Sequence, residues 1–209
     1  MTNKSPNKDP SCTSLVLINL EGIDGCGKST QSQFLMEKFE SDNEKTILLK
    51  EPTNGKYGQK LWEMLSGKIE ATTEEILELF VLDRKEHVNE KIKPALDEGK
   101  IVLMDRYYYS TMAYQAAAGI DVSRIRKDNE FAPKPDIVLI FDLPADLAMK
   151  RVRSHSVADV FEKEEHLEKV RKAYLNLEDD PLVRIIDATR TPEEIFDEVW
   201  KLVSEVRNG

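Results

Sequence analysis

The sequence predicts an α/β fold in which a five-stranded parallel sheet carries helices on both of its faces. Two observations support this prediction. Short apolar runs rich in β-branched residues recur along the chain without sustained polar alternation, as buried parallel strands do. Longer segments with helical spacing of apolar residues lie between these runs. This alternation indicates strand–helix–strand units with right-handed crossovers, in which ligands gather at the carboxyl ends of the strands.

The elements follow one another in a regular order. The first predicted strand is residues 15–20, and a glycine-rich stretch leads from it into a predicted helix at 28–39. Further runs of the strand type lie at 46–50, 101–104, 137–141 and 183–186. Further segments of the helix type lie at 73–98, 145–153, 162–177 and 192–206. The last helix has a clear start, because Thr191 can be the N-cap, Pro192 the first helical residue, and Glu194 the partner in a capping box.

The composition fits one globular domain over residues 15–209, preceded by a flexible tail at 1–14. With 209 residues, 40% hydrophobic and 33% charged, the chain can bury an ordinary core. The net charge of −9 argues against broad contact with nucleic acid, although a small anionic ligand needs only a local cluster of cations. No apolar run suits a signal segment or membrane span, and Cys12 and Cys26 match no disulfide or zinc pattern, so we expect a cytoplasmic protein.

A phosphate-binding loop is predicted directly after the first strand. The stretch Gly-Ile-Asp-Gly-Cys-Gly-Lys-Ser-Thr at 22–30 matches the P-loop pattern G-x-x-x-x-G-K-[ST] and runs into a helix. Lys28 would reach the β- and γ-phosphates of a nucleotide, and Ser29 would ligate Mg²⁺. The alternative is a glycine turn that serves packing alone. The residues expected to surround ATP are Gly22, Ile23, Asp24, Gly25, Cys26, Gly27, Lys28, Ser29 and Thr30.

A P-loop by itself fits a kinase, a GTPase, a motor or a transporter subunit. A GTPase would carry an Asn-Lys-x-Asp guanine-reading motif late in the chain, and this sequence has none. A motor would need partner surfaces or a longer chain than 209 residues provide. These observations favour a kinase.

Two constellations outside the P-loop point to the acceptor. Asp105 and Arg106 follow the predicted strand at 101–104, where an acid can hold magnesium through water and an arginine can clamp phosphate. The alternative is a salt bridge at a strand end. Phe80 and Arg84 are four residues apart in the long predicted helix, so one face of it could stack on a flat base and donate to its carbonyl. The alternative is a core phenylalanine beside a solvated arginine.

The motifs together resemble the thymidylate kinase family, over nearly the whole span from residue 15 to the last helix. Glu-Pro-Thr at 51–53 is similar to the archaeal form of one of them. In chain order the motifs are residues 21–30, 51–53, 79–84, 105–110, 113–115, 135–136, 159–162 and 170–175.

This resemblance implies a role for each acceptor residue. Phe80 would stack on thymine, Arg84 would contact its carbonyl, and Arg106 would bind the phosphate of dTMP. Asp105 would lie on the magnesium side, and Asp24 would contact the deoxyribose hydroxyl. The other residues implied to line the substrate site are Glu51, Pro52, Ser110, Tyr114 and Gln115.

The implied reaction is in-line attack by a phosphate oxygen of dTMP on the γ-phosphorus of ATP, with Mg²⁺ and without a covalent intermediate or general base. Members of the family are commonly homodimers, and we expect one here. Two alternatives remain: a kinase of the same fold with another nucleoside monophosphate or a deoxynucleoside as acceptor, and a nucleotide-binding module that has lost catalysis.

The family also implies a short lid, which we expect at about 154–160. Members supply an arginine to the transferring group from the P-loop or from the lid, and the P-loop here has Gly25 in that place. Residues 154–159 contain no arginine, so we expect Arg153 to take this role, and Arg151 could equally face the adenine.

Overall fold

The computed structural model describes residues 16–151 and 157–208. Within these residues, parallel strands form a five-stranded sheet in the order β2-β3-β1-β4-β5. The strands are β1 (Leu17–Glu21), β2 (Thr46–Lys50), β3 (Ile101–Asp105), β4 (Ile137–Asp142) and β5 (Val183–Asp187). Each predicted strand overlaps one of them. The predicted parallel sheet is therefore confirmed.

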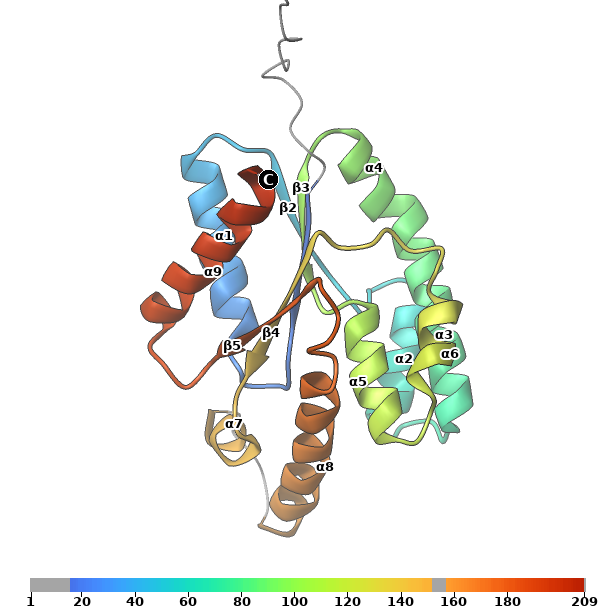
Figure 1. Ribbon diagram of the computed structural model, residues 1–209. Coiled ribbons are helices and arrows are strands. Elements are labelled where there is room, and N and C mark those ends of the chain that lie inside the picture. Colours follow the sequence, from blue (N-terminus) through green and yellow to red (C-terminus); the bar gives the residue numbers. More distant parts are fainter. Residues whose placement is uncertain (1–15, 152–156, 209) are drawn as a thin grey trace, which may run out of the picture.

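Helices cover both faces of this sheet, as predicted (Figure 1). One face carries α1 (Lys28–Ser41) and α9 (Pro192–Asn208). The other carries α3 (Thr73–His87), α4 (Lys93–Asp97), α5 (Tyr108–Ala117) and α6 (Val122–Asp128), with α2 (Lys56–Leu65) packed on α3. Near the carboxyl ends of the strands lie α7 (Ala145–Arg151) and α8 (Val157–Leu175), and α8 packs against α5.

The centre of the sheet positions the functional loops. β1 lies between β3 and β4, and Leu20 of β1 pairs with Asp105 of β3 and with Leu139 of β4. The chain leaves β1 toward the face that carries α1 and leaves β3 toward the face that carries α5 (Figure 1). A crevice between two such strand ends is where open α/β sheets bind their ligands.

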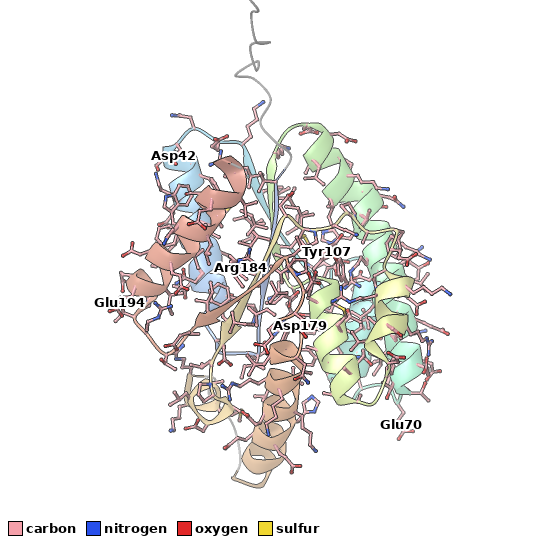
Figure 2. The ribbon with its side chains drawn as sticks, viewed as in Figure 1. Asp42, Glu70, Tyr107, Asp179, Arg184 and Glu194 are labelled. Atoms are coloured by element: carbon pink, nitrogen blue, oxygen red, sulfur yellow. The ribbon has the colours of Figure 1, made fainter. Side chains whose placement is uncertain are left out.

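The core has one layer on each side of the sheet. β1 and β3 are buried at every position. On one side, Phe39 of α1 meets Trp200 of α9 with their ring centroids 5.4 Å apart. On the other side, the ring of Tyr107 is completely buried, and Figure 2 shows it in the interior, while the labelled Asp42 and Glu194 lie at the periphery. No helix among the described residues is both long and apolar enough to span a membrane.

The helix predicted at 73–98 has an interruption that the sequence analysis did not anticipate. A π-helical turn, η1 (Val88–Ile92), separates α3 from α4. Pro94 explains it, because proline lacks an N–H to donate and its ring crowds the carbonyl of Glu90 four residues earlier. A wider turn before Pro94 relieves that crowding without ending the helix.

The remaining helices differ from the predictions at their ends. The first residue of α8 is Val157, so residues 157–160 of the predicted lid are helical, while residues 154–156 lie outside the described part of the chain, as do residues 1–14. The predicted capping box of α9 is confirmed: the N–H of Thr191 donates to Glu194 Oε2 (3.0 Å), and the N–H of Glu194 donates to Thr191 Oγ1 (3.3 Å). Three helices, α2, α5 and α6, were not predicted.

Candidate active site

The residues predicted to hold phosphates form one loop between β1 and α1. Gly22, Gly25 and Gly27 have φ angles of +134°, +86° and +101°, which side chains rarely adopt. At Gly22 a Cβ atom would lie 2.7 Å from the carbonyl oxygen of Phe141, so no side chain fits there. The loop ends at the N-terminus of α1, where unpaired backbone N–H groups and the helix dipole favour an anion.

Lys28, the first residue of α1, folds back over this loop. Its Nζ donates to the carbonyl oxygens of Gly22 (2.9 Å) and Ile23 (3.0 Å) and lies 3.6 Å from Sγ of Cys26. Burial lowers the pKa of Lys28, and the nearby cation of Arg106 lowers the same pKa further. A phosphate in the loop would offer this ammonium a better partner than neutral carbonyl oxygens do.

A cleft of about 410 Å³ lies beside the loop. It is lined by every side chain that the sequence analysis assigned to substrate binding. These side chains come from the P-loop, the end of β2, α3 and the β3–α5 segment. These residues are Asp24, Glu51, Pro52, Phe80, Arg84, Arg106, Ser110, Tyr114 and Gln115. Residues far apart in the sequence are thus brought to one place at the carboxyl edge of the sheet.

Five further residues line the cleft and were not predicted to do so: Lys50, Trp62, Leu65, Tyr107 and His166. Trp62 and Leu65 belong to α2, and each keeps 48% of its surface exposed. Their spacing of three residues, soon after the Glu-Pro-Thr motif, is a helical signal that could have revealed them. His166 on α8 has no such signal, because only the packing of α8 on α5 brings it to the cleft.

Arg106 links the P-loop to the cleft. Its Nη2 donates to Asp24 Oδ1 (2.7 Å) and to the hydroxyl of Tyr114 (3.4 Å), and its Nη1 donates to Ser110 Oγ (3.0 Å). Partial burial raises the pKa of Asp24, but the cations of Arg106 and Lys28 outweigh that effect, so the pKa is lowered overall. The pair thus places an ionised carboxylate and a guanidinium beside the phosphate-binding loop.

Arg84 lines the same cleft but is held by protein groups. It is only 1% exposed, and its Nε donates to Glu51 Oε2 (2.8 Å). Nη1 donates to Asn129 Oδ1 (2.6 Å), and Nη2 donates to Thr111 Oγ1 (3.2 Å). The other carboxylate oxygen of Glu51 lies 3.1 Å from Nδ1 of His87. These contacts fix the guanidinium rigidly, so any ligand would meet it in one orientation.

The predicted magnesium residues occupy neighbouring strand and helix ends. Asp105 is the last residue of β3; its Oδ2 lies 3.4 Å from Lys50 Nζ, and its buried Oδ1 has no hydrogen-bond partner among the described residues. Ser29 is exposed in the first turn of α1. The described part of the chain holds no group of three His, Cys, Asp or Glu side chains that could bind a metal alone. Mg²⁺ commonly takes only one or two protein ligands beside waters and phosphates, so Ser29 and Asp105 fit it.

Arg151 ends α7 and donates through Nη2 to the carbonyl oxygen of Ala188, 3.3 Å away, at the start of the β5–α9 connection. Arg153 lies outside the described residues.

Comparison with known proteins gives a consistent result. A family model described as "Thymidylate kinase" matches residues 20–199. The chain is 42% identical to the "Probable thymidylate kinase" of Archaeoglobus fulgidus, over 92% of this chain and 97% of that protein. It is 42% identical to the "Thymidylate kinase" of Desulfotalea psychrophila, over 91% of this chain and 95% of that protein. It is 38% identical to the "Thymidylate kinase" of two strains of Xylella fastidiosa, over 91% of this chain and 91% (strain Temecula1) or 88% (strain M23) of that protein.

Proposed function

The chain belongs to the thymidylate kinase family, and we propose that it transfers the γ-phosphoryl group of ATP to dTMP, giving dTDP and ADP. The observation that supports this most is the shared cleft beside the P-loop, which is lined by every residue expected to hold dTMP. The cleft offers an aromatic ring and a fixed guanidinium suited to a base, and a second guanidinium suited to a phosphate.

We assign the acceptor contacts within this cleft as follows. Phe80 stacks on thymine and Arg84 donates to a thymine carbonyl, while Ser110, Tyr114 and Gln115 complete the surface around the nucleoside. Arg106 binds the phosphate of dTMP through Nη2, which already faces the cleft residues Asp24 and Tyr114. Asp24 is then free to contact the deoxyribose hydroxyl. The residues around the base limit how far it can turn, which fixes the phosphate as well.

ATP binds on the other side of Asp24, with its phosphates in the loop at 22–30. Backbone N–H groups of the loop and the ammonium of Lys28 surround the β- and γ-phosphates. Ser29 and Asp105 would hold Mg²⁺, whose chemistry there is to neutralise charge on the β- and γ-phosphates. Arg151 at the end of α7 faces the adenine.

The reaction then needs positioning more than proton chemistry. A phosphate oxygen of dTMP is already ionised at neutral pH, so no side chain has to deprotonate it. Arg106 aims that oxygen and Lys28 stabilises the charge on the transferring group. We propose that the enzyme acts in the cytoplasm as a homodimer, which sedimentation would detect as twice the chain mass of 23.9 kDa.

The test is an ADP-release assay with ATP and Mg²⁺, in which dTMP, dUMP, dCMP, dGMP, dAMP and thymidine are offered separately. We expect a clear preference for dTMP. Lys28→Ala is the control, and it should fold but lose about 100-fold or more in turnover. Preference for another monophosphate would leave the assignment as a kinase intact and would overturn the base contacts proposed for Phe80 and Arg84. Absence of turnover with every acceptor would contradict the enzyme assignment.

A further inference from the structure

The last residue of β1, Glu21, has a completely buried carboxylate that none of the roles above uses. Its Oε2 accepts hydrogen bonds from Ser110 Oγ (2.5 Å) and from the hydroxyl of Tyr174 (2.9 Å). Its Oε1 accepts one from the N–H of Tyr107 (2.8 Å). Because a buried carboxylate is costly unless it is paired and hydrogen-bonded, these donors and the nearby Arg106 explain why it is tolerated. The carboxylate thus joins β1, the start of α5 and the end of α8.

The same hydroxyl groups hold one side of the Arg106 guanidinium. Nη1 donates to Ser110 Oγ (3.0 Å) and to the hydroxyl of Tyr174 (3.3 Å). Nη2 is directed instead toward Asp24 and Tyr114, which line the cleft. The planar guanidinium is therefore fixed from its inner side and presents its outer side to the ligand.

The backbone of Arg106 is held by the same cluster. Its φ of +69° lies in the left-handed region, which is strained for a residue with a side chain. The N–H of Arg106 donates to the carbonyl oxygen of Leu20 (3.0 Å), and the next N–H, that of Tyr107, donates to Glu21. Strain of this kind persists only where surrounding contacts hold it.

We propose that Tyr174, anchored on Glu21, is a positioning residue for Arg106 and so for the phosphate of dTMP. Tyr174 is 1% exposed and acts through Arg106, without touching the acceptor. Tyr174 belongs to α8, so the orientation of the Arg106 guanidinium depends on how that helix packs against α5. This inference rests on the proposed function, because Arg106 is assigned there to the acceptor phosphate.

The experiment is a double-mutant cycle on the dissociation constant for dTMP, measured by calorimetry with the full chain. Tyr174→Phe removes one hydroxyl and keeps the buried ring. We expect it to weaken dTMP binding about three- to tenfold, the effect of losing one typical hydrogen bond. In an Arg106→Ala background the same change should have almost no effect, because the group it acts through is gone.

Tyr109→Phe is the matched control. Tyr109 is also buried and its hydroxyl also donates to a carboxylate, that of Asp180 (3.0 Å), but it makes no contact with Arg106. It should lose thermal stability as Tyr174→Phe does and leave dTMP affinity unchanged.

The possible outcomes separate the two proposals. If the unmodified chain does not bind dTMP, the proposed function fails. If it binds dTMP and Arg106→Ala weakens binding, but Tyr174→Phe has no effect or an equal effect in both backgrounds, the function stands and the positioning role of Tyr174 is overturned. Equal losses of dTMP affinity in Tyr174→Phe and Tyr109→Phe would show a general structural effect and would overturn it as well.

Discussion

Phe80 and Arg84 share the acceptor cleft but differ in how much of the fold depends on them. Arg84 is the partner of the buried carboxylate of Glu51, so its removal would leave that charge with only His87 beside it. Losing one member of a buried ion pair typically costs 3–5 kcal/mol of folding free energy. Arg84→Ala would therefore mix a binding effect with a stability effect. Phe80 is only partly buried and makes a cleaner probe of base binding.

Phe80→Ala is expected to raise KM for dTMP about 5- to 150-fold, because stacking of a base on an aromatic side chain is worth about 1–3 kcal/mol. KM for ATP should stay within about twofold, since Phe80 lies in the acceptor cleft and not in the P-loop. Steady-state kinetics with each substrate varied in turn would measure both constants. Equal increases in the two constants would contradict the stacking role.

Most of the residues that line the cleft could be predicted from the sequence because short motifs contain them. The contacts that hold Arg84 could not. Thr111 and Asn129 reach it from α5 and from the end of α6, 27 and 45 residues away, and no local pattern signals a partner at that distance. The orientation of Arg106 was hidden in the same way, since Tyr174 is 68 residues away from it.

At the level of elements, strands were predictable and helices only in part. The central strands are buried on both faces, so their sequences are continuous apolar runs. α5 is also almost entirely buried, and it begins with consecutive tyrosines. Buried helices lack the alternation of polar and apolar faces, and aromatic residues favour strands, so the sequence gives no helical signal there.

The connection between α5, α6 and β5 depends on Asp180. Its Oδ2 accepts from the hydroxyl of Tyr109 (3.0 Å) and lies 2.9 Å from Nη2 of Arg126, while its Oδ1 accepts from the N–H of Leu182 (3.1 Å). Burial raises the pKa of Asp180, but the three donors outweigh burial and lower it overall. The folded chain therefore binds a proton at this carboxyl less readily than the unfolded chain does. Its contribution to stability is complete above the unfolded pKa near 3.8 and is lost as pH falls through the lower folded value.

Asp180→Asn should accordingly lower the free energy of unfolding by about 1–3 kcal/mol at pH 7. The difference from the unmodified chain should shrink as pH falls below about 4, where the carboxyl becomes protonated. Urea titrations at a series of pH values measure both effects. Asp179→Asn makes the same charge change one residue earlier at an exposed side chain and should change stability by less than about 0.5 kcal/mol. A constant gap between Asp180→Asn and the unmodified chain across this pH range would refute the linkage.

At the scale of the whole molecule, an acidic protein concentrates cations at one edge of its sheet. The net charge is −9, yet Lys28, Lys50, Arg84 and Arg106 lie in the P-loop or around the adjoining cleft. Like charges held so close together disfavour one another, as the lowered pKa of Lys28 illustrates: burial lowers it first, and the cation of Arg106 lowers it further. Arg84, Arg106 and Lys50 already pair with Glu51, Asp24 and Asp105, whereas Lys28 Nζ donates to neutral carbonyl oxygens. The folded protein therefore holds cationic groups in one place where an anionic ligand can meet them, and the unfolded chain does not.

That difference predicts that dTMP stabilises the whole fold. A ligand that binds only the folded state at 100 times its dissociation constant adds about 2.7 kcal/mol, which in a chain of this size raises Tm by about 5–10 °C. The cleft is lined by residues from the P-loop, β2, α2, α3, α5 and α8, so the shift should appear as one cooperative transition. Calorimetric melts at one fixed ligand concentration should show a smaller shift with thymidine, which lacks the phosphate proposed to bind Arg106. The shift should also be smaller with dCMP, which has an amino group in place of the 4-carbonyl proposed to accept from Arg84. If thymidine matched dTMP, the phosphate contact would be refuted; if dCMP matched dTMP, the base contact would be refuted. Each contact can thus fail without the other, and neither result depends on turnover.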